Sequence, residues 1–224
     1  FHRQFIEEVA QKVDRRMYKE AFVQNEVLID AQPDNPEHWV RKAHLLALTG
    51  RGAEALQLLD RIVNTLFPDI TEQQLVSQRM EASLAAGDFK QAASLALTVK
   101  VLPGGEYIEP YADVIRAVAL EKMNPPEAEA LWKEIEKLGR TDPRYWTAAS
   151  EVFLYLAPDA DRAYEYVVRA ARATPPPDGA LLRIAAEMSW ERGAKSQALN
   201  FLEHALERDP EDPRALQLLQ TWEP

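Results

Sequence analysis

The chain has 224 residues, with 36 Asp and Glu against 26 Lys and Arg, and its formal net charge is -10. It contains no cysteine, so disulfide bonds, thiolate zinc sites and thiol nucleophiles are excluded. The acidic balance disfavours a phosphate-neutralising surface, and we therefore expect no nucleic-acid partner and instead a basic or cationic one. No stretch reaches the roughly 18 consecutive apolar residues that a membrane span requires.

The two ends of the sequence suggest a piece of a longer protein. The start, Phe1-His2-Arg3-Gln4-Phe5, has neither an initiator Met nor the apolar core of a signal peptide. Residues 216–224 begin an amphipathic pattern and then stop. Between these ends, 8 Gly and 15 Pro favour short helices with regular stops over β-rich folds.

Six alanines mark a regular repeat along the chain. They follow one another at intervals of 34, 37, 36, 35 and 35 residues, and seven residues after each stands another small or aliphatic residue. Seven residues are two helical turns, so both members of a pair lie on one helix face. We therefore expect six helices with a buried stripe, each the second helix of a repeat unit. The alanines are Ala21, Ala55, Ala92, Ala128, Ala163 and Ala198, and their partners are Leu28, Ile62, Val99, Ile135, Ala170 and Ala205.

The first helix of a unit begins at a recurring Asn-Pro or Asp-Pro pair. Such pairs stand at 35–36, 142–143 and 212–213. An Asn or Asp side chain satisfies a free backbone N–H at the start of a helix, and proline has no N–H to lose in the first turn. The spacings between the pairs are close to three and two repeat periods, in agreement with the alanines.

The turns between paired helices are expected to differ among the units. Gly50, Gly87 and Gly193 are expected to end first helices, because glycine adopts the left-handed backbone conformation at low cost. The fourth turn is expected to be short and the fifth to be longer by about one residue. These two turns are residues 123–126 and 157–161, while residues 102–107 predict an expanded connection and residues 174–178 a stiff one.

Together these residues resemble the tetratricopeptide repeat (TPR) family over nearly the whole chain. The resemblance is clearest in the second and sixth units. The fourth unit departs from it, since Arg116 stands where a small residue is expected, so that either the register shifts to Ala117 or Val118 or the unit is distorted. A related helix-pair family, the half-a-TPR repeats, is the nearest alternative. The matching positions are Trp39, Ala43, Gly50, Ala55, Ile62 and Pro68, and then Leu182, Ala186, Gly193, Ala198, Ala205 and Pro210.

The predicted fold is all-α, and the resemblance implies a right-handed α-solenoid of about six helix-turn-helix repeats. Each pair of helices buries too little apolar surface alone and is stabilised by its neighbours. We expect a single domain over residues 1–224, with a terminal helix over 213–224 that is either a cap or half of a truncated unit. The expected repeats are residues 2–35, 36–69, 70–107, 108–142, 143–178 and 179–212.

The sequence offers no arrangement typical of catalysis. His2, His38, His44 and His204 never stand in a metal-binding spacing. Gly50-Arg51-Gly52 lacks the Lys and Ser or Thr of a phosphate loop, and Asp159-Ala160-Asp161 is too short a ligand series for calcium. We therefore expect no enzyme activity, no metal and no cofactor.

In TPR-like arrays one face of each first helix lines an inner groove. The resemblance places eight residues there: Val40, His44, Ser77, Glu81, Thr147, Glu151, Arg183 and Glu187. Three of these are Glu, which favours a basic protein partner whose binding weakens as salt rises, and disfavours the carboxylate-binding subset of the family. An alternative is that these are ordinary solvated helix positions.

A second row of residues stands eight positions before each alanine. It consists of Val13, Ala47, Leu84, Leu120, Tyr155 and Trp190. Packing between neighbouring first helices is one interpretation, and aromatic contact with a ligand by the last two is the other. The candidate partner-binding site combines both rows and comprises His44, Glu81, Glu151, Tyr155, Arg183, Glu187 and Trp190.

The sequence thus predicts a non-catalytic protein–protein interaction scaffold within a larger assembly. Similar TPR arrays occur in periplasmic regions of bacterial exopolysaccharide-export and envelope-assembly proteins, including those of biofilms. The resemblance therefore implies a periplasmic location and a polysaccharide-modifying enzyme or a cationic polymer as partner. The alternative is an architectural spacer or self-association module without a dedicated ligand groove.

Overall fold

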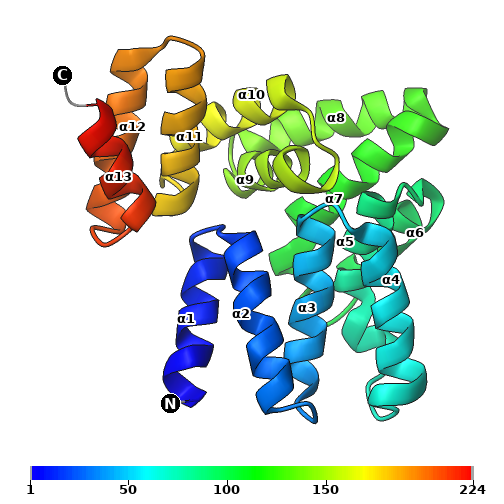
Figure 1. The fold of residues 1–224 in the computed structure, drawn as a ribbon. Coiled ribbons are helices and arrows are strands. Elements are labelled where there is room, and N and C mark those ends of the chain that lie inside the picture. Colours follow the sequence, from blue (N-terminus) through cyan, green and yellow to red (C-terminus); the bar gives the residue numbers. More distant parts are fainter. Residues whose placement is uncertain (1, 223–224) are drawn as a thin grey trace.

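The computed structural model describes residues 2–222, with side chains from residue 5 onward. Over this part the chain forms α-helices, three short helical turns of other types, and no β-strand (Figure 1). The all-α prediction is therefore confirmed. None of the described helices combines the length and the apolar character needed to cross a membrane.

The helices come in consecutive pairs joined by short turns. The first members are α1 (His2–Asp14), α3 (Pro36–Leu48), α5 (Val76–Ala86), α7 (Gly105–Met123), α9 (Arg144–Glu151) and α11 (Gly179–Glu191). The second members are α2 (Tyr18–Ala31), α4 (Gly52–Arg61), α6 (Phe89–Lys100), α8 (Pro125–Gly139), α10 (Ala160–Ala171) and α12 (Lys195–Arg208). Helix α13 (Pro213–Trp222) closes the described chain, and the last two residues expected for it, 223–224, lie outside the described part.

Each expected repeat segment holds one of these pairs, apart from small shifts at the boundaries. The largest shift is at residues 102–107, because α7 already begins at Gly105 and the connection from α6 is correspondingly shorter than expected. Gly105 lies so close to the end of α6 that a Cβ atom would stand 2.5 Å from the carbonyl oxygen of Lys100. Only a residue without a side chain permits this approach.

The repeated alanines lie where the helices are closest. All six are at most 2% exposed, and so are the six residues seven positions later. Each second helix packs between its own first helix and the next one along the chain. The small side chains leave room for this close packing.

The turns within the helix pairs agree with the sequence-based expectation in the second, third, fourth and sixth units and differ from it in the fifth. Gly50, Gly87 and Gly193 have φ angles of 80°, 78° and 78°, which confirms the predicted left-handed stops. Asn124 alone separates α7 from α8, as a short fourth turn requires. The prediction of a lengthened fifth turn at 157–161 was wrong in its placement: the extra residue is absorbed by the π-helical turn η3 (Val152–Leu156), which follows α9 without a break and adds a residue per turn.

The departure at Arg116 is a change of register. Arg116 is half-buried and forms an ion pair with Glu127 at 2.5 Å, whereas Ala117 is fully buried. The small residue thus stands one position later, in α7, the longest of the described helices.

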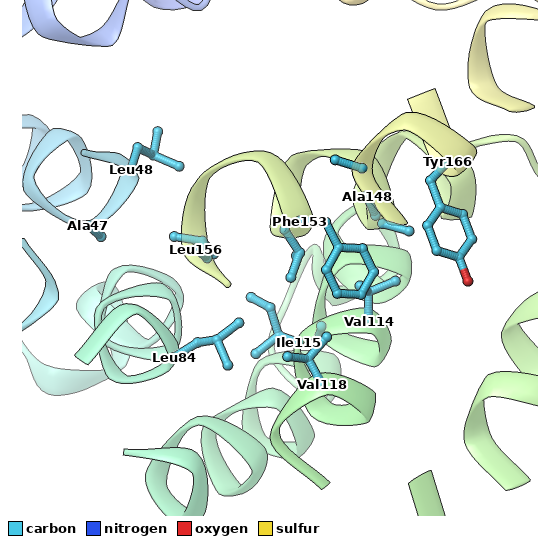
Figure 2. Packing of buried hydrophobic residues seen from close by; sticks show 14 of the residues in the cluster. Ala47, Leu48, Leu84, Val114, Ile115, Val118, Ala148, Phe153, Leu156 and Tyr166 are labelled. Atoms are coloured by element: carbon cyan, nitrogen blue, oxygen red, sulfur yellow. The ribbon is translucent and has the colours of Figure 1, made fainter. Parts of the chain in front are cut away.

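The array curves inward until its fifth pair touches its second. The π-helical turn η3 packs against α3, α5 and α7. Figure 2 shows Leu48 of α3, Leu84 of α5, Ile115 of α7 and Leu156 of η3 pointing toward one another in this region. The inner side of the curve is therefore partly filled by apolar side chains, and what remains open is confined to a few cavities.

Two further short turns complete the fold. A second π-helical turn, η1 (Ile62–Leu66), extends α4, and a 3-10 turn, η2 (Glu72–Leu75), leads into α5.

The turn between α1 and α2 lies near α11 and α12 (Figure 1), and Nε of Arg15 lies 2.7 Å from a carboxylate oxygen of Asp209 just after α12. The first and last helix pairs are therefore in direct contact.

Candidate partner-binding groove

Three adjoining cavities, of about 420, 570 and 720 Å³, follow the inner side of the array. The first shares Tyr18 and Leu48 with the second, and His44, Glu81 and Ile108 with the third. We refer to them together as the groove. The first helices supply much of its wall, including Val40, Arg41 and His44 of α3, Ser77 and Glu81 of α5, Tyr111 of α7, Arg144, Thr147 and Glu151 of α9, and Arg183 and Glu187 of α11.

His44 and Glu81 form an ion pair across α3 and α5. Nδ1 of His44 lies 2.6 Å from Oε2 of Glu81, and the side chains are 31% and 9% exposed. Burial of His44 disfavours its charged form, but the charge and hydrogen bond of Glu81 outweigh this and raise the pKa of His44. Burial together with the nearby carboxylates of Glu81 and Glu151 raises the pKa of Tyr111 of α7. Glu81 is therefore paired with His44 from the neighbouring first helix.

Glu151 is bound by an arginine from the other end of the chain. Nη2 of Arg16, in the turn between α1 and α2, lies 2.5 Å from Oε1 of Glu151. The Arg16 side chain is only 7% exposed. Burial disfavours its charge, yet the neighbouring carboxylates raise the pKa of Arg16, so it stays positively charged.

Arg183 and Glu187 belong to a buried network at the end of the groove. Nε of Arg183 lies 2.9 Å from Oδ2 of Asp212, and these side chains are 4% and 2% exposed. One carboxylate oxygen of Glu187 accepts hydrogen bonds from Arg183 at 3.1 Å and from Arg214 at 2.8 Å. The network ties α11 to the start of α13.

The three glutamates predicted to give the groove its negative charge are thus all engaged within the chain. Their side chains are 9%, 27% and 19% exposed, so none of the three is fully open to solvent. The sequence was expected to offer these glutamates to a basic partner, whereas in the structure each of them is already paired. Each glutamate already faces a cation: Arg183 stands one helical turn from Glu187 on α11, His44 faces Glu81 from the neighbouring first helix, and the curvature of the array brings Arg16 against Glu151.

The two aromatic candidates lie in different surroundings. Tyr155 lines the second cavity and meets Tyr18 edge to face, with ring centroids 4.9 Å apart. Burial raises the pKa of Tyr155 to about 12. Trp190 instead stacks on Trp222 of α13, with ring centroids 4.3 Å apart and planes 5° from parallel, and does not line the three cavities. The structure therefore brings Tyr155, but not Trp190, to the groove.

Sequence reasoning missed several groove residues. Tyr18 begins α2, and Arg16 precedes it in a turn, so neither stands on the first-helix face from which candidates were drawn. Tyr107 belongs to the segment expected to be a connection, but it lies in α7, lines the first cavity and is 79% exposed. The adjacent arginines Arg15 and Arg16 are visible in the sequence, but no local signal points to their partners, which stand 135 to 194 positions away.

The remaining histidines have no shared site. His38 is buried and lies 3.2 Å from Oε1 of Gln32 and from Nδ2 of Asn35. His204 is exposed on α12, and the side chain of His2 lies outside the described part. Among the described residues, no group of three or more His, Asp or Glu is arranged to hold a metal ion.

Comparison of the sequence with protein-family models and with curated proteins gave no match.

Proposed function

We propose that this chain is a non-catalytic scaffold that binds a protein partner in the groove. In this proposal the six helix pairs are TPR-like units of a right-handed α-solenoid, and α13 is its terminal cap. The observation that carries it is the composition of the groove wall: five successive first helices each contribute at least one side chain to connected cavities. Because each of these units places at least one side chain in the groove, the groove suits an extended peptide segment of a partner that lies along successive units.

The partner that we propose presents basic side chains to the glutamates of the groove. The lining holds Glu81, Glu151 and Glu187 beside as many basic side chains as acidic ones, among them Arg41, Arg144 and Arg214, and its aromatic groups include Tyr18, Tyr107 and Tyr111. A partner's Lys or Arg can exchange with His44 or Arg16 on a carboxylate and lie against a phenol ring at the same time. The overall charge of -10 attracts such a partner at a distance.

The setting that we propose is the bacterial envelope. The TPR-like spacing resembles periplasmic regions of exopolysaccharide-export and envelope-assembly proteins, which suggests a polysaccharide-modifying enzyme or a cationic polymer as partner. This part of the proposal depends on the sequence resemblance alone.

Site-specific photo-cross-linking tests the groove. A photoreactive amino acid is placed at Thr147 in the first cavity or at Ser77 in the third, and, as controls, at the exposed positions Ala53 on α4 and Ala130 on α8. We expect one partner protein to be cross-linked from the groove positions only, and less of it as salt rises. A partner captured equally from the controls, or cross-links only between copies of this chain, would contradict the proposal, and the latter would favour an architectural spacer.

A further inference from the structure

The turn between α1 and α2 occupies an acidic surface formed by the other end of the chain. Nε and Nη2 of Arg15 lie 2.7 and 3.1 Å from the carboxylate of Asp209. Arg16 donates to both oxygens of Asp178, at 2.5 and 3.1 Å, and to Glu151. We call the surface formed by Glu151, Asp178, Arg183 and Asp209 the arginine seat.

The seat recognises the backbone of the turn as well as its charges. Nη2 of Arg183 donates a hydrogen bond of 2.9 Å to the carbonyl oxygen of Arg15. The pKa of Asp209 is lowered by its hydrogen bond to Arg15, and that of Asp178 is lowered by Arg16 despite its burial. The four residues of the seat, which stand 135 to 194 positions away in the chain, thus bind the two guanidinium groups of the turn and one of its backbone carbonyl groups.

The chain's own turn fits this seat at a cost. Arg16 has a φ angle of 54°, in the left-handed region that residues with a side chain rarely adopt. Its Nε is buried and has no hydrogen-bond partner among the described residues. A turn with the same two guanidinium groups but without this strain would fit the seat better.

We propose that the arginine seat binds a paired-arginine turn of a protein partner, and that Arg15 and Arg16 are its resident competitor. The inference rests on the proposed function, because it specifies the partner's chemistry. The acidic residues of the seat and the basic turn that occupies it are complementary in charge, and their contacts define what a competing segment must present: two adjacent guanidinium groups and a backbone carbonyl. Binding of the partner then requires the α1–α2 turn to leave.

The probe is a backbone-cyclised peptide with the sequence of residues 12–20 of this chain, carrying a fluorophore. Its affinity is measured by anisotropy for three full-length proteins: the unchanged chain, R15A/R16A, and K133A/K137A. The last is a matched control that removes two positive charges from exposed positions on α8. A tethered competitor acts at an effective concentration on the order of millimolar, so R15A/R16A is expected to bind the peptide at least about ten-fold more tightly than the other two.

Two further arms test whether the peptide occupies the seat. Adding E151Q and D178N to R15A/R16A is expected to abolish the gain, and so is a peptide with citrulline in place of both arginines. Equal affinity of R15A/R16A and the unchanged chain, or a gain that survives E151Q and D178N, would overturn the proposal.

A measurement on the unchanged protein covers the case in which R15A/R16A does not fold. Hydrogen exchange at the backbone amides of residues 15–21 is followed with and without excess peptide. Faster exchange is expected when the peptide is present, because the turn is displaced, and unchanged exchange would contradict the proposal. If the unchanged protein forms a dimer and R15A/R16A does not, the occupant of the seat is a second copy of this chain. That result would also overturn the proposal.

Failure here is distinguishable from failure of the proposed function. Cross-linking from Thr147 and Ser77 reports on a partner in the groove whether or not the seat is used. Peptide binding reports on the seat without any natural partner.

Discussion

Arg183 and Asp212 form an ion pair that is almost entirely withdrawn from solvent, with Nε and Oδ2 2.9 Å apart and the side chains 4% and 2% exposed. Asp212 also accepts hydrogen bonds from the backbone N–H groups of Arg214 and Ala215 at the start of α13. One carboxylate therefore neutralises a buried cation and caps a helix. Removal of a partner from such a pair leaves the other charge buried without compensation.

We expect Asp212→Ala to lower the free energy of unfolding by about 3 to 5 kcal/mol, measured by urea denaturation. The matched control is Asp161→Ala, because Asp161 is 99% exposed and pairs with Arg192 at 3.1 Å. A solvent-exposed pair contributes about 0 to 1 kcal/mol. Similar small losses in both variants would mean that the buried pair is not formed in solution.

The pair of His44 and Glu81 predicts a stability that depends on pH. The pKa of His44 is raised in the folded chain, so the folded state holds the proton more tightly than the unfolded chain, whose pKa is about 6.5. The resulting stabilisation is complete below about pH 6.5 and is lost as the pH rises through the higher folded-state pKa.

We expect His44→Gln to lower the free energy of unfolding by about 1.5 kcal/mol near pH 6, and by much less at about pH 9. The measurement is urea denaturation of both proteins across this range. His204→Gln, at an exposed position on α12, is the control and should change stability equally at both ends. An effect of His44→Gln that does not vary with pH would show that the imidazole is neutral throughout.

Gly52 and Gly50 flank the same turn but resist substitution for different reasons. A Cβ atom on Gly52 would stand 2.4 Å from the backbone nitrogen of Ala86, whereas one on Gly50 would meet nothing within 4 Å. Gly50 has the left-handed φ angle of 80° instead. We expect Gly52→Ala to cost about 1 to 3 kcal/mol through overpacking and Gly50→Ala about 1 kcal/mol through backbone strain.

Replacement by Asn separates these two causes. Asn tolerates the left-handed conformation, so Gly50→Asn should recover most of the loss, measured as the midpoint of thermal unfolding. Gly52→Asn should remain at least as destabilised as Gly52→Ala. Recovery at both positions would contradict the close approach of α4 and α5.

The repeated alanines make a prediction that applies along the whole array. Ala55 is fully buried on α4, while Ala53 on the same helix is exposed. Ala55→Leu should force the helices apart and cost about 1 to 3 kcal/mol in urea denaturation, and Ala53→Leu should have almost no effect. If both variants were equally stable, the spacing of α4 from its neighbours would be looser than described.

The stacked rings of Trp190 and Trp222 predict how α13 is held. Their contact is worth about 0.5 to 1.5 kcal/mol beyond the area that it buries. Trp222→Ala should therefore increase hydrogen exchange in α13 and shift the fluorescence of Trp190 toward that of a solvated indole. Trp39→Ala is the control, because Trp39 donates to the carbonyl oxygen of Pro33 far from α13 and should leave exchange there unchanged.

The helices could be predicted because their signals are local. Ala55 with Ile62, and Asn35 with Pro36, act within a single helix, and the periods of 3.6 and about 35 residues make each position support the others. The shift from Arg116 to Ala117 was only one of the alternatives that the sequence left open, and the π-helical turn at 152–156 was not predicted. Both depend on how a helix fits the helices beside it, which local preference does not encode.

The groove was predictable in part for the same reason. His44 and Glu81 hold equivalent positions in successive units, so a regular array brings them together. The contact of Arg16 with Glu151 spans 135 positions and exists only because the array curves until its ends meet. No pattern of spacing predicts the degree of that curvature, and so the pairing of Glu151 with Arg16 was missed.

The ion pair between Arg15 and Asp209 gives the array a resistance to stretching that an array without contact between its ends lacks. Tension applied between the termini would be borne first by this ion pair and its neighbours, since they bridge the first and last helix pairs directly. Extension would then begin with a short, abrupt release at one joint, and the gradual separation of stacked helices would follow only after it.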